Sequence, residues 1–73
     1  MVQIGNRYKE RMPSFVGNGH CFFDYTYIVK RFRHEPYGDF AVCERLYKDG
    51  KKDRVDIDIE LLENEKTCYE KIA

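Results

Sequence analysis

The feature that most constrains the fold is a strict alternation of apolar and charged side chains over residues 54–60. Val55, Ile57 and Ile59 occupy every second position, and the positions after them carry carboxylates: Asp56, Asp58 and Glu60. Successive side chains of a β-strand point to opposite faces, so this pattern gives one apolar face and one charged face. Three β-branched residues favour a strand over the helix that the spacing of Ile57 and Leu61 would allow. The segment is predicted to be a half-buried strand.

A hairpin is predicted immediately before this strand. Residues 39–47 form a second apolar and aromatic segment, and the sequence Lys-Asp-Gly-Lys at 48–51 joins it to the alternating strand. Gly50, and less readily Asp49, accepts the positive φ that a tight hairpin turn requires. The two strands are therefore expected to pair antiparallel.

The rest of the chain divides by composition into loops, strands and one turn. The expected segments are strands at 2–9, 22–32 and 67–72, loops at 13–20 and 33–39, and a single helical turn at 61–64. Gly5 is expected to bend or bulge the first strand. The long strand at 22–32 is expected to bend or twist, and Pro36 and Gly38 place the loop after it. Five strands result.

Composition supports an all-β chain with one domain over residues 1–73. Six Tyr and five Phe suit a pleated, half-buried surface, whereas alanine, the best helix former, occurs only twice. A chain of 73 residues buries only about 60% of its unfolded surface, which leaves little room for a deep catalytic cavity. The sequence therefore predicts one small antiparallel β domain.

The order of these elements resembles a small SH3-like barrel. The resemblance lies in the layout: five short strands, a long first loop, a late tight hairpin and a helical turn before the last strand. It implies a closed five-stranded barrel. In size and general character the chain is also similar to accessory proteins of phages and mobile elements, some of which inhibit host defence systems.

The charge balance limits the classes of partner. Lys plus Arg and Asp plus Glu are equal at 13 each, for a formal net charge of zero. A DNA-mimicking inhibitor would be strongly acidic, and a bulk nucleic-acid coat would need a clear positive excess. The longest uncharged run is well short of the roughly 20 apolar residues of a membrane span. Gln3, Asn6 and Arg7 interrupt the apolar stretch that a secretion signal needs, so no such signal is expected. No membrane partner and a cytoplasmic location are expected.

The cysteines and histidines do not form a recognisable chemical motif. Cys21, Cys43 and Cys68 are too far apart for a short zinc spacing and odd in number, so free thiols are expected, with Cys43 acting as a small core hydrophobe. His20 beside Cys21, and His34 with the other cysteines, lack the spacing of a zinc or thiol site. We therefore predict a protein that is not an enzyme and that has no metal or cofactor.

The most suggestive stretch for binding is Lys-Arg-Phe-Arg-His at 30–34. Cations beside an aromatic ring suit single-stranded nucleic acid or an acidic protein surface. The alternative is that Phe32 lies in the core and the cations are solvated. Tyr25, Tyr27, Tyr37 and Tyr47 are candidates for an aromatic patch; Tyr25 and Tyr27 share a strand face that is either buried or a partner site.

Together these observations predict a binding module that acts on a protein partner and inhibits it by occlusion, for example in a host defence or gene-expression complex. The predicted contact residues are Tyr25, Tyr27, Lys30, Arg31, Arg33, His34 and Tyr37. Two alternatives remain open at this point. One is a nucleic-acid-binding barrel that uses the basic and aromatic strand end, and the other is a subunit that completes a marginal core by forming a homodimer.

Overall fold

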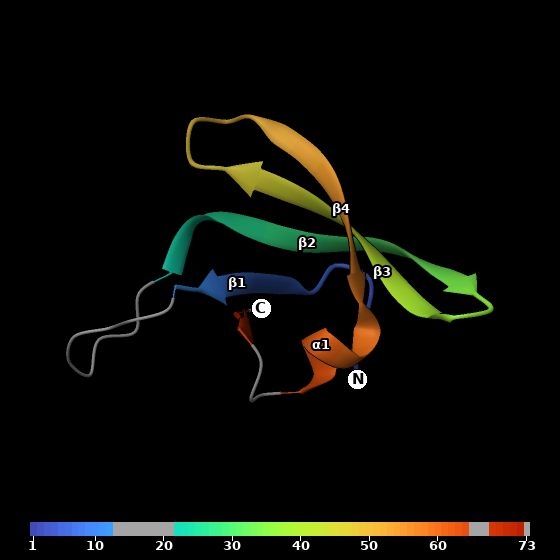
Figure 1. The fold of residues 1–73 in the computed structure, drawn as a ribbon. Helices are drawn as coiled ribbons and strands as arrows, with labels where there is room; N and C mark the ends of the chain where they lie inside the picture. The colour runs from blue at the N-terminus through green and yellow to red at the C-terminus, as the bar shows by residue number, and fades with distance from the viewer. Residues whose placement is uncertain (13–21, 65–67, 73) are drawn as a thin grey trace.

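A single antiparallel sheet organises the computed structural model, which describes residues 1–12, 22–64 and 68–72. Within these residues the strands are ordered β4-β3-β2-β1-β5, and a short helix, α1, precedes the last strand (Figure 1). The elements are β1 (Arg7–Arg11), β2 (Phe22–Glu35), β3 (Gly38–Tyr47), β4 (Lys52–Asp58), α1 (Ile59–Glu63) and β5 (Tyr69–Lys71). The predicted all-β class, with five antiparallel strands and a short helix before the last, is confirmed.

The sheet is open. β4 and β5 lie at its two ends, and no pairing joins them in the described part of the chain. The closed SH3-like barrel implied by the layout of the sequence is therefore not confirmed.

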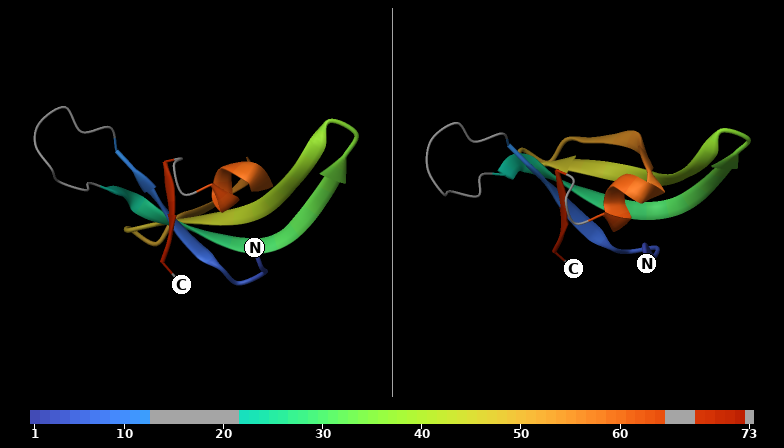
Figure 2. Two further views of the ribbon diagram at one scale, coloured as in Figure 1. Left: turned by 90° about the horizontal axis from the view of Figure 1, so that it is seen from below. Right: turned by 60° about the horizontal axis from the view of Figure 1, so that its bottom comes forward.

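The core lies on one face of the sheet, which we call the inner face. Figure 2 shows α1 against this face, within the curve of β2 and β3. The buried side chains that pack together there are Val2, Tyr8, Tyr27, Val29, Ala41, Cys43, Ile57 and Leu62. Cys43 is completely buried, so its predicted role as a small core hydrophobe is confirmed. We call the opposite face of the sheet the outer face.

A β-bulge in β2 produces the bend expected for this strand. Val29 pairs with Cys43 and Arg31 pairs with Val42, which leaves Lys30 as an extra residue in the ladder. Because side chains alternate, a bulge changes which positions point inward. Tyr27 and Val29 are inward before it, and Phe32, three residues later, packs against the same core.

The predicted hairpin between β3 and β4 is confirmed. Gly50 N–H donates to the Tyr47 carbonyl at 3.0 Å, and Tyr47 N–H donates to the Lys51 carbonyl at 2.8 Å. Gly50 has φ of 92°, in the left-handed region where a residue with a Cβ is strained. Glycine is thus required at this position, and the register of β4 against β3 follows from the turn.

Two predicted boundaries around β2 and β4 are wrong. Residues 33–39 do not form a loop: β2 continues to Glu35, β3 begins at Gly38, and only Pro36 and Tyr37 form the turn. The alternating strand ends at Asp58 because the carboxylate of this residue accepts a hydrogen bond from Glu60 N–H at 2.9 Å and caps α1. Ile59 and Glu60, predicted as strand, are therefore helical.

The ends of the chain also differ from prediction. The first strand begins at Arg7, because residues 3–6 form a turn in which Asn6 N–H donates to the Gln3 carbonyl at 3.1 Å. Gly5, the expected site of a bend, lies in that turn. The last strand is shorter than the predicted 67–72. The loop predicted at 13–20 lies outside the described residues.

Candidate functional site

Aromatic rings gather on the inner face where β2 begins and β3 ends. Tyr25 and Tyr47 are cross-strand partners whose ring centroids are 5.6 Å apart, and Phe23 stacks on Tyr25 at 5.3 Å. The Arg45 guanidinium lies 5.4 Å from the Tyr25 centroid and 5.3 Å from the Tyr47 centroid. We call Phe23, Tyr25, Arg45 and Tyr47 the aromatic patch. All four side chains are partly exposed.

Asp53 of β4 fixes the position of Arg45. Arg45 Nε donates to Oδ1 of Asp53 at 2.9 Å and the terminal nitrogen donates to Oδ2 at 2.6 Å. The Tyr47 hydroxyl donates to the same Oδ2 at 3.0 Å. The Arg45 hydrogen bonds lower the pKa of the Asp53 carboxyl and raise the pKa of the Arg45 guanidinium. A two-pronged arginine–carboxylate pair holds a defined geometry, so the patch is organised before any partner binds.

Glu10 of β1 connects the patch to the core. Its Oε1 accepts hydrogen bonds from the Tyr25 hydroxyl at 2.9 Å and from the Tyr27 hydroxyl at 2.7 Å. Tyr27 is 2% exposed, and its ring also meets that of Tyr69 at 5.5 Å. Burial, followed by the hydrogen bond to Glu10, raises the pKa of Tyr27. Tyr27 therefore belongs to the core, with Tyr69 packed against it, whereas the rings of Phe23, Tyr25 and Tyr47 remain partly exposed.

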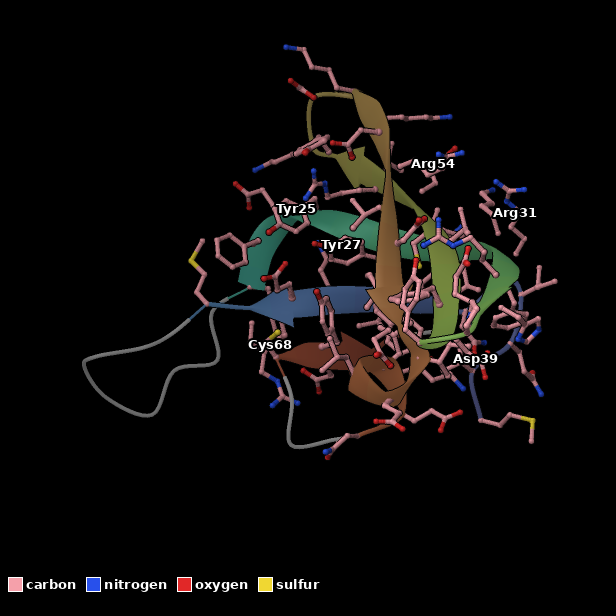
Figure 3. All side chains as sticks on the ribbon, turned by 45° about the vertical axis from the view of Figure 1, so that its right-hand side comes forward. Tyr25, Tyr27, Arg31, Asp39, Arg54 and Cys68 are labelled. Atoms are coloured by element: carbon pink, nitrogen blue, oxygen red, sulfur yellow. The ribbon has the colours of Figure 1, made fainter. Side chains whose placement is uncertain are left out.

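The outer face carries a separate basic groove of about 440 Å³. The bulge in β2 contributes Lys30 and Arg31 to its lining, and β4 contributes Lys52 and Arg54. We call these four cations and their surroundings the outer groove. Lys52 lies 3.9 Å from a Glu44 carboxylate oxygen, whereas the described residues place no carboxylate within ion-pair distance of the other three cations. Figure 3 shows Arg31 and Arg54 near each other, away from Tyr25 and Tyr27.

The structure distributes the seven predicted contact residues over several places. Tyr25 belongs to the aromatic patch and Tyr27 to the core, whereas Lys30 and Arg31 line the outer groove. The remaining three residues lie toward or at the β2–β3 turn, where Tyr37 is 75% exposed: Arg33, His34 and Tyr37. They do not form one continuous surface, because the aromatic and unpaired basic side chains lie on opposite faces.

The residues near the β2–β3 turn have partners within the chain. An Arg33 terminal nitrogen lies 2.9 Å from Asp56 Oδ2, and the guanidinium lies 5.2 Å from the centroid of the Phe40 ring. His34 Nδ1 lies 2.8 Å from Asp39 Oδ1. Arg33 thus binds across the outer face, and its charge is compensated before a ligand could use it.

Sequence reasoning missed Phe23, Arg45 and Asp53 as site residues, and it named Tyr47 only as a candidate aromatic. Alternation along the predicted strand at 39–47 was a usable signal, since Arg45 and Tyr47 are two apart and must share a face. Asp53 lies opposite Arg45 because of the hairpin register. This register begins where Tyr47 N–H donates to the Lys51 carbonyl, and counting outward from that hydrogen bond pairs the two residues.

The described side chains bear on the metal and thiol chemistry that was considered from the sequence. No group of three or more His, Cys, Asp or Glu side chains that could hold a metal ion occurs among them. Burial raises the pKa of the Cys43 thiol to about 11, so the reactive thiolate is scarce at neutral pH.

We expect the thiols of Cys43 and Cys68 to react very differently with iodoacetamide at pH 8. Cys68 is exposed, whereas Cys43 is fully buried and its thiolate is disfavoured. Peptide mass spectrometry should show at least tenfold slower labelling of Cys43 in the native protein and equal labelling of both in urea. Rapid native labelling of Cys43 would contradict the packing described above.

The sequence and fold were compared with known proteins. No family model matches. Searches among curated proteins and among solved structures also found no match. Within the described residues, no helix is long and apolar enough to cross a membrane. The functional proposal therefore depends on the geometry of the aromatic patch and the outer groove.

Proposed function

We propose that this chain is a non-enzymatic binding module that docks on a protein partner through the aromatic patch. The observation that carries the proposal is the position of Arg45, which is held over two tyrosine rings by a two-pronged bond to Asp53. Tyrosine and arginine dominate the binding energy of protein interfaces, and rigid rings lose little entropy on binding. A partly exposed, preorganised cluster of these residue types suits a protein surface.

The electrostatics of the inner face favour a protein over a nucleic acid. The Glu10 carboxylate lies beside the rings and would repel phosphates, and the charge of Arg45 is already compensated by Asp53. Three cations for which the described residues provide no acidic partner, Lys30, Arg31 and Arg54, lie in the groove on the outer face instead. Single-stranded nucleic acid needs stacking rings and cations along one surface, and the described residues separate them.

Occlusion is the mode of action that we propose for such a binder. The described residues hold no cluster of metal ligands, and a domain this small would act most simply by covering a surface of its partner. The likeness in size and character to phage accessory proteins supports a host defence or gene-expression complex as the partner class. We also propose that the fold is related to SH3-like barrels. The proposed partner is a protein and not a membrane.

The test is affinity capture from a cell lysate with two matched double variants. Phe23→Ser with Tyr47→Ser removes rings from the aromatic patch, and Lys30→Glu with Arg31→Glu reverses charge in the outer groove. We expect the first variant to capture at least tenfold less of the protein partner than the wild type does. Truncating a hot-spot aromatic costs about 2 kcal/mol or more of binding free energy. The second variant and nuclease treatment should leave the capture unchanged. Circular dichroism verifies that both variants fold.

The outer groove supports the second candidate, a nucleic-acid-binding module. Lys30, Arg31 and Arg54 project into one groove without acidic partners among the described residues. Phosphate contacts by such cations release counterions, so binding would weaken steeply with salt. Loss of all captured partners with nuclease, and with the Lys30→Glu, Arg31→Glu variant alone, would replace the protein-binding proposal with this one.

A further inference from the structure

The backbone along the free edge of β4 is used by neither proposed surface. β4 ends the sheet, and in the part of the chain that the structure describes no strand pairs with its other side. An uncovered edge strand displays backbone N–H and C=O groups that another strand can pair with. β4 is also regular, since its register against β3 runs from Leu46–Lys52 to Phe40–Asp58 without a shift.

The register determines which backbone groups of β4 are available. Tyr47 N–H donates to the Lys51 carbonyl, and hydrogen-bonded pairs alternate with non-bonded pairs along an antiparallel ladder. Asp53, Val55 and Ile57 therefore direct their backbone groups toward β3. The residues between and beside them direct theirs outward, along the free edge: Lys52, Arg54, Asp56 and Asp58.

The side chains at this edge are self-complementary in charge. In an antiparallel pair of β4 strands with its two-fold axis at Val55, Arg54 lies opposite Asp56 of a second copy, and Lys52 lies opposite Asp58. Both pairs have their backbone groups directed outward, so they coincide with hydrogen-bonded positions. Two-fold symmetry repeats each pair, and opposite charges at directly facing positions stabilise a ladder.

Other symmetric registers place like charges opposite each other. A two-fold axis at Arg54 or at Asp56 puts that residue against its own copy. An axis at Ile57 puts Asp56 against Asp58, and an axis at Asp53 puts Lys52 against Arg54. Like charges at facing positions are destabilising, so charge selects the register centred on Val55.

We propose that the occupant of this edge is a second copy of the chain, which pairs through β4 to form a two-fold dimer with one continuous sheet. On the inner face Val55, partly buried in the monomer, lies against its own copy. On the outer face Lys52 and Arg54 face carboxylates, so dimerisation withdraws two cations from the outer groove. The inference does not rest on the aromatic patch, whose Phe23 and Tyr25 are on β2.

The decisive experiment uses two charge-reversal variants that should dimerise weakly alone and strongly when mixed. Arg54→Asp makes the edge acidic, and Asp56→Arg makes it basic. Asp56→Arg also removes the carboxylate that pairs with Arg33, so circular dichroism verifies that each variant is folded. Each homodimer then has like charges at its central pairs, whereas in the mixed dimer every Asp at 54 or 56 faces an Arg. Sedimentation equilibrium should give a wild-type mass approaching twice 8.8 kDa as concentration rises. Each variant should dimerise at least tenfold more weakly, and an equimolar mixture should recover the wild-type dimer.

A cysteine probe tests the register in the same dimer. At a non-hydrogen-bonded pair the facing Cα atoms are about 4.5 Å apart, within disulfide range. In a background of Cys21→Ser and Cys68→Ser, Val55→Cys should cross-link under mild oxidation and Lys52→Cys should not. The proposal is overturned if the wild type stays monomeric at millimolar concentration, if the charge variants dimerise normally, if the mixture does not recover, or if Lys52→Cys cross-links instead.

Discussion

Replacing Tyr27 with alanine is expected to lower the free energy of unfolding by about 3–5 kcal/mol, the usual cost of removing a buried aromatic ring. Tyr27 is 2% exposed, contacts the ring of Tyr69 and donates its hydroxyl proton to Glu10. A domain of this length has a total stability of roughly 4–11 kcal/mol. Urea unfolding at pH 7, followed by circular dichroism, should therefore show a strongly lowered midpoint, with the variant unfolded even without urea if the wild type lies at the low end of that range.

Two matched substitutions separate the ring from the hydroxyl and the core from the surface. Tyr27→Phe keeps the packing but removes a hydrogen bond to a carboxylate, so we expect a loss of about 1–2 kcal/mol. Tyr37→Ala removes a ring that is 75% exposed and should change stability by less than about 0.5 kcal/mol. Equal losses for Tyr27→Ala and Tyr37→Ala would show that Tyr27 does not belong to the core.

The β3–β4 hairpin could be predicted because its signals are local. The alternation around Val55 and Ile57 specifies which face is buried, and Gly50 specifies the turn. The end of β4 could not be predicted from the same alternation. Ile59 continues the apolar pattern, but Asp58 caps a helix, and the burial of Leu62 against the inner face stabilises that helix.

β2 was predicted too short because its alternation changes phase. Val29 and Phe32 both point inward although they are three positions apart, and a single extra residue, Lys30, accounts for the difference. Without a bulge, period two places these two side chains on opposite faces. Pro36 suggests a longer loop, but the turn between β2 and β3 consists only of Pro36 and Tyr37.

The same bulge explains why the predicted binding residues do not form one surface. Nearness in sequence suggested that Tyr25, Tyr27 and the basic stretch would be neighbours. In the sheet, Tyr25 points to the inner face, and Lys30 and Arg31 line a groove on the outer face. Residues of a candidate site on strands therefore have to be assigned to a face of the sheet. In β2 this assignment depends on the position of the bulge, which shifts the register between Val29 and Arg31.

Raising the pH above 10 is expected to destabilise the protein until it unfolds cooperatively, because the buried tyrosines ionise at a higher pH in the folded chain than in the unfolded chain. Burial is the main cause that raises the pKa of Tyr27, and it raises the pKa of Tyr69 to about 12, against an ordinary value of 10.0. The unfolded chain therefore releases these protons first. Stability from this source is complete below pH 10 and falls above it, by up to about 1.4 kcal/mol per pH unit for each tyrosine.

The loss is comparable with the lower part of the range of roughly 4–11 kcal/mol expected for the total stability of the domain. Partial solvent access to Tyr69 reduces its share, and the two tyrosines together remove roughly 3–5 kcal/mol by pH 12. Cys43, whose pKa is raised to about 11, acts in the same direction from pH 9 upward.

The absorbance of tyrosinate at about 295 nm and the β-sheet circular dichroism should change together between roughly pH 11 and 12. Tyr27→Phe should make the pH dependence shallower by about 1.4 kcal/mol per unit. Smooth ionisation of the tyrosines with the sheet intact would contradict the buried position of the Tyr27 hydroxyl.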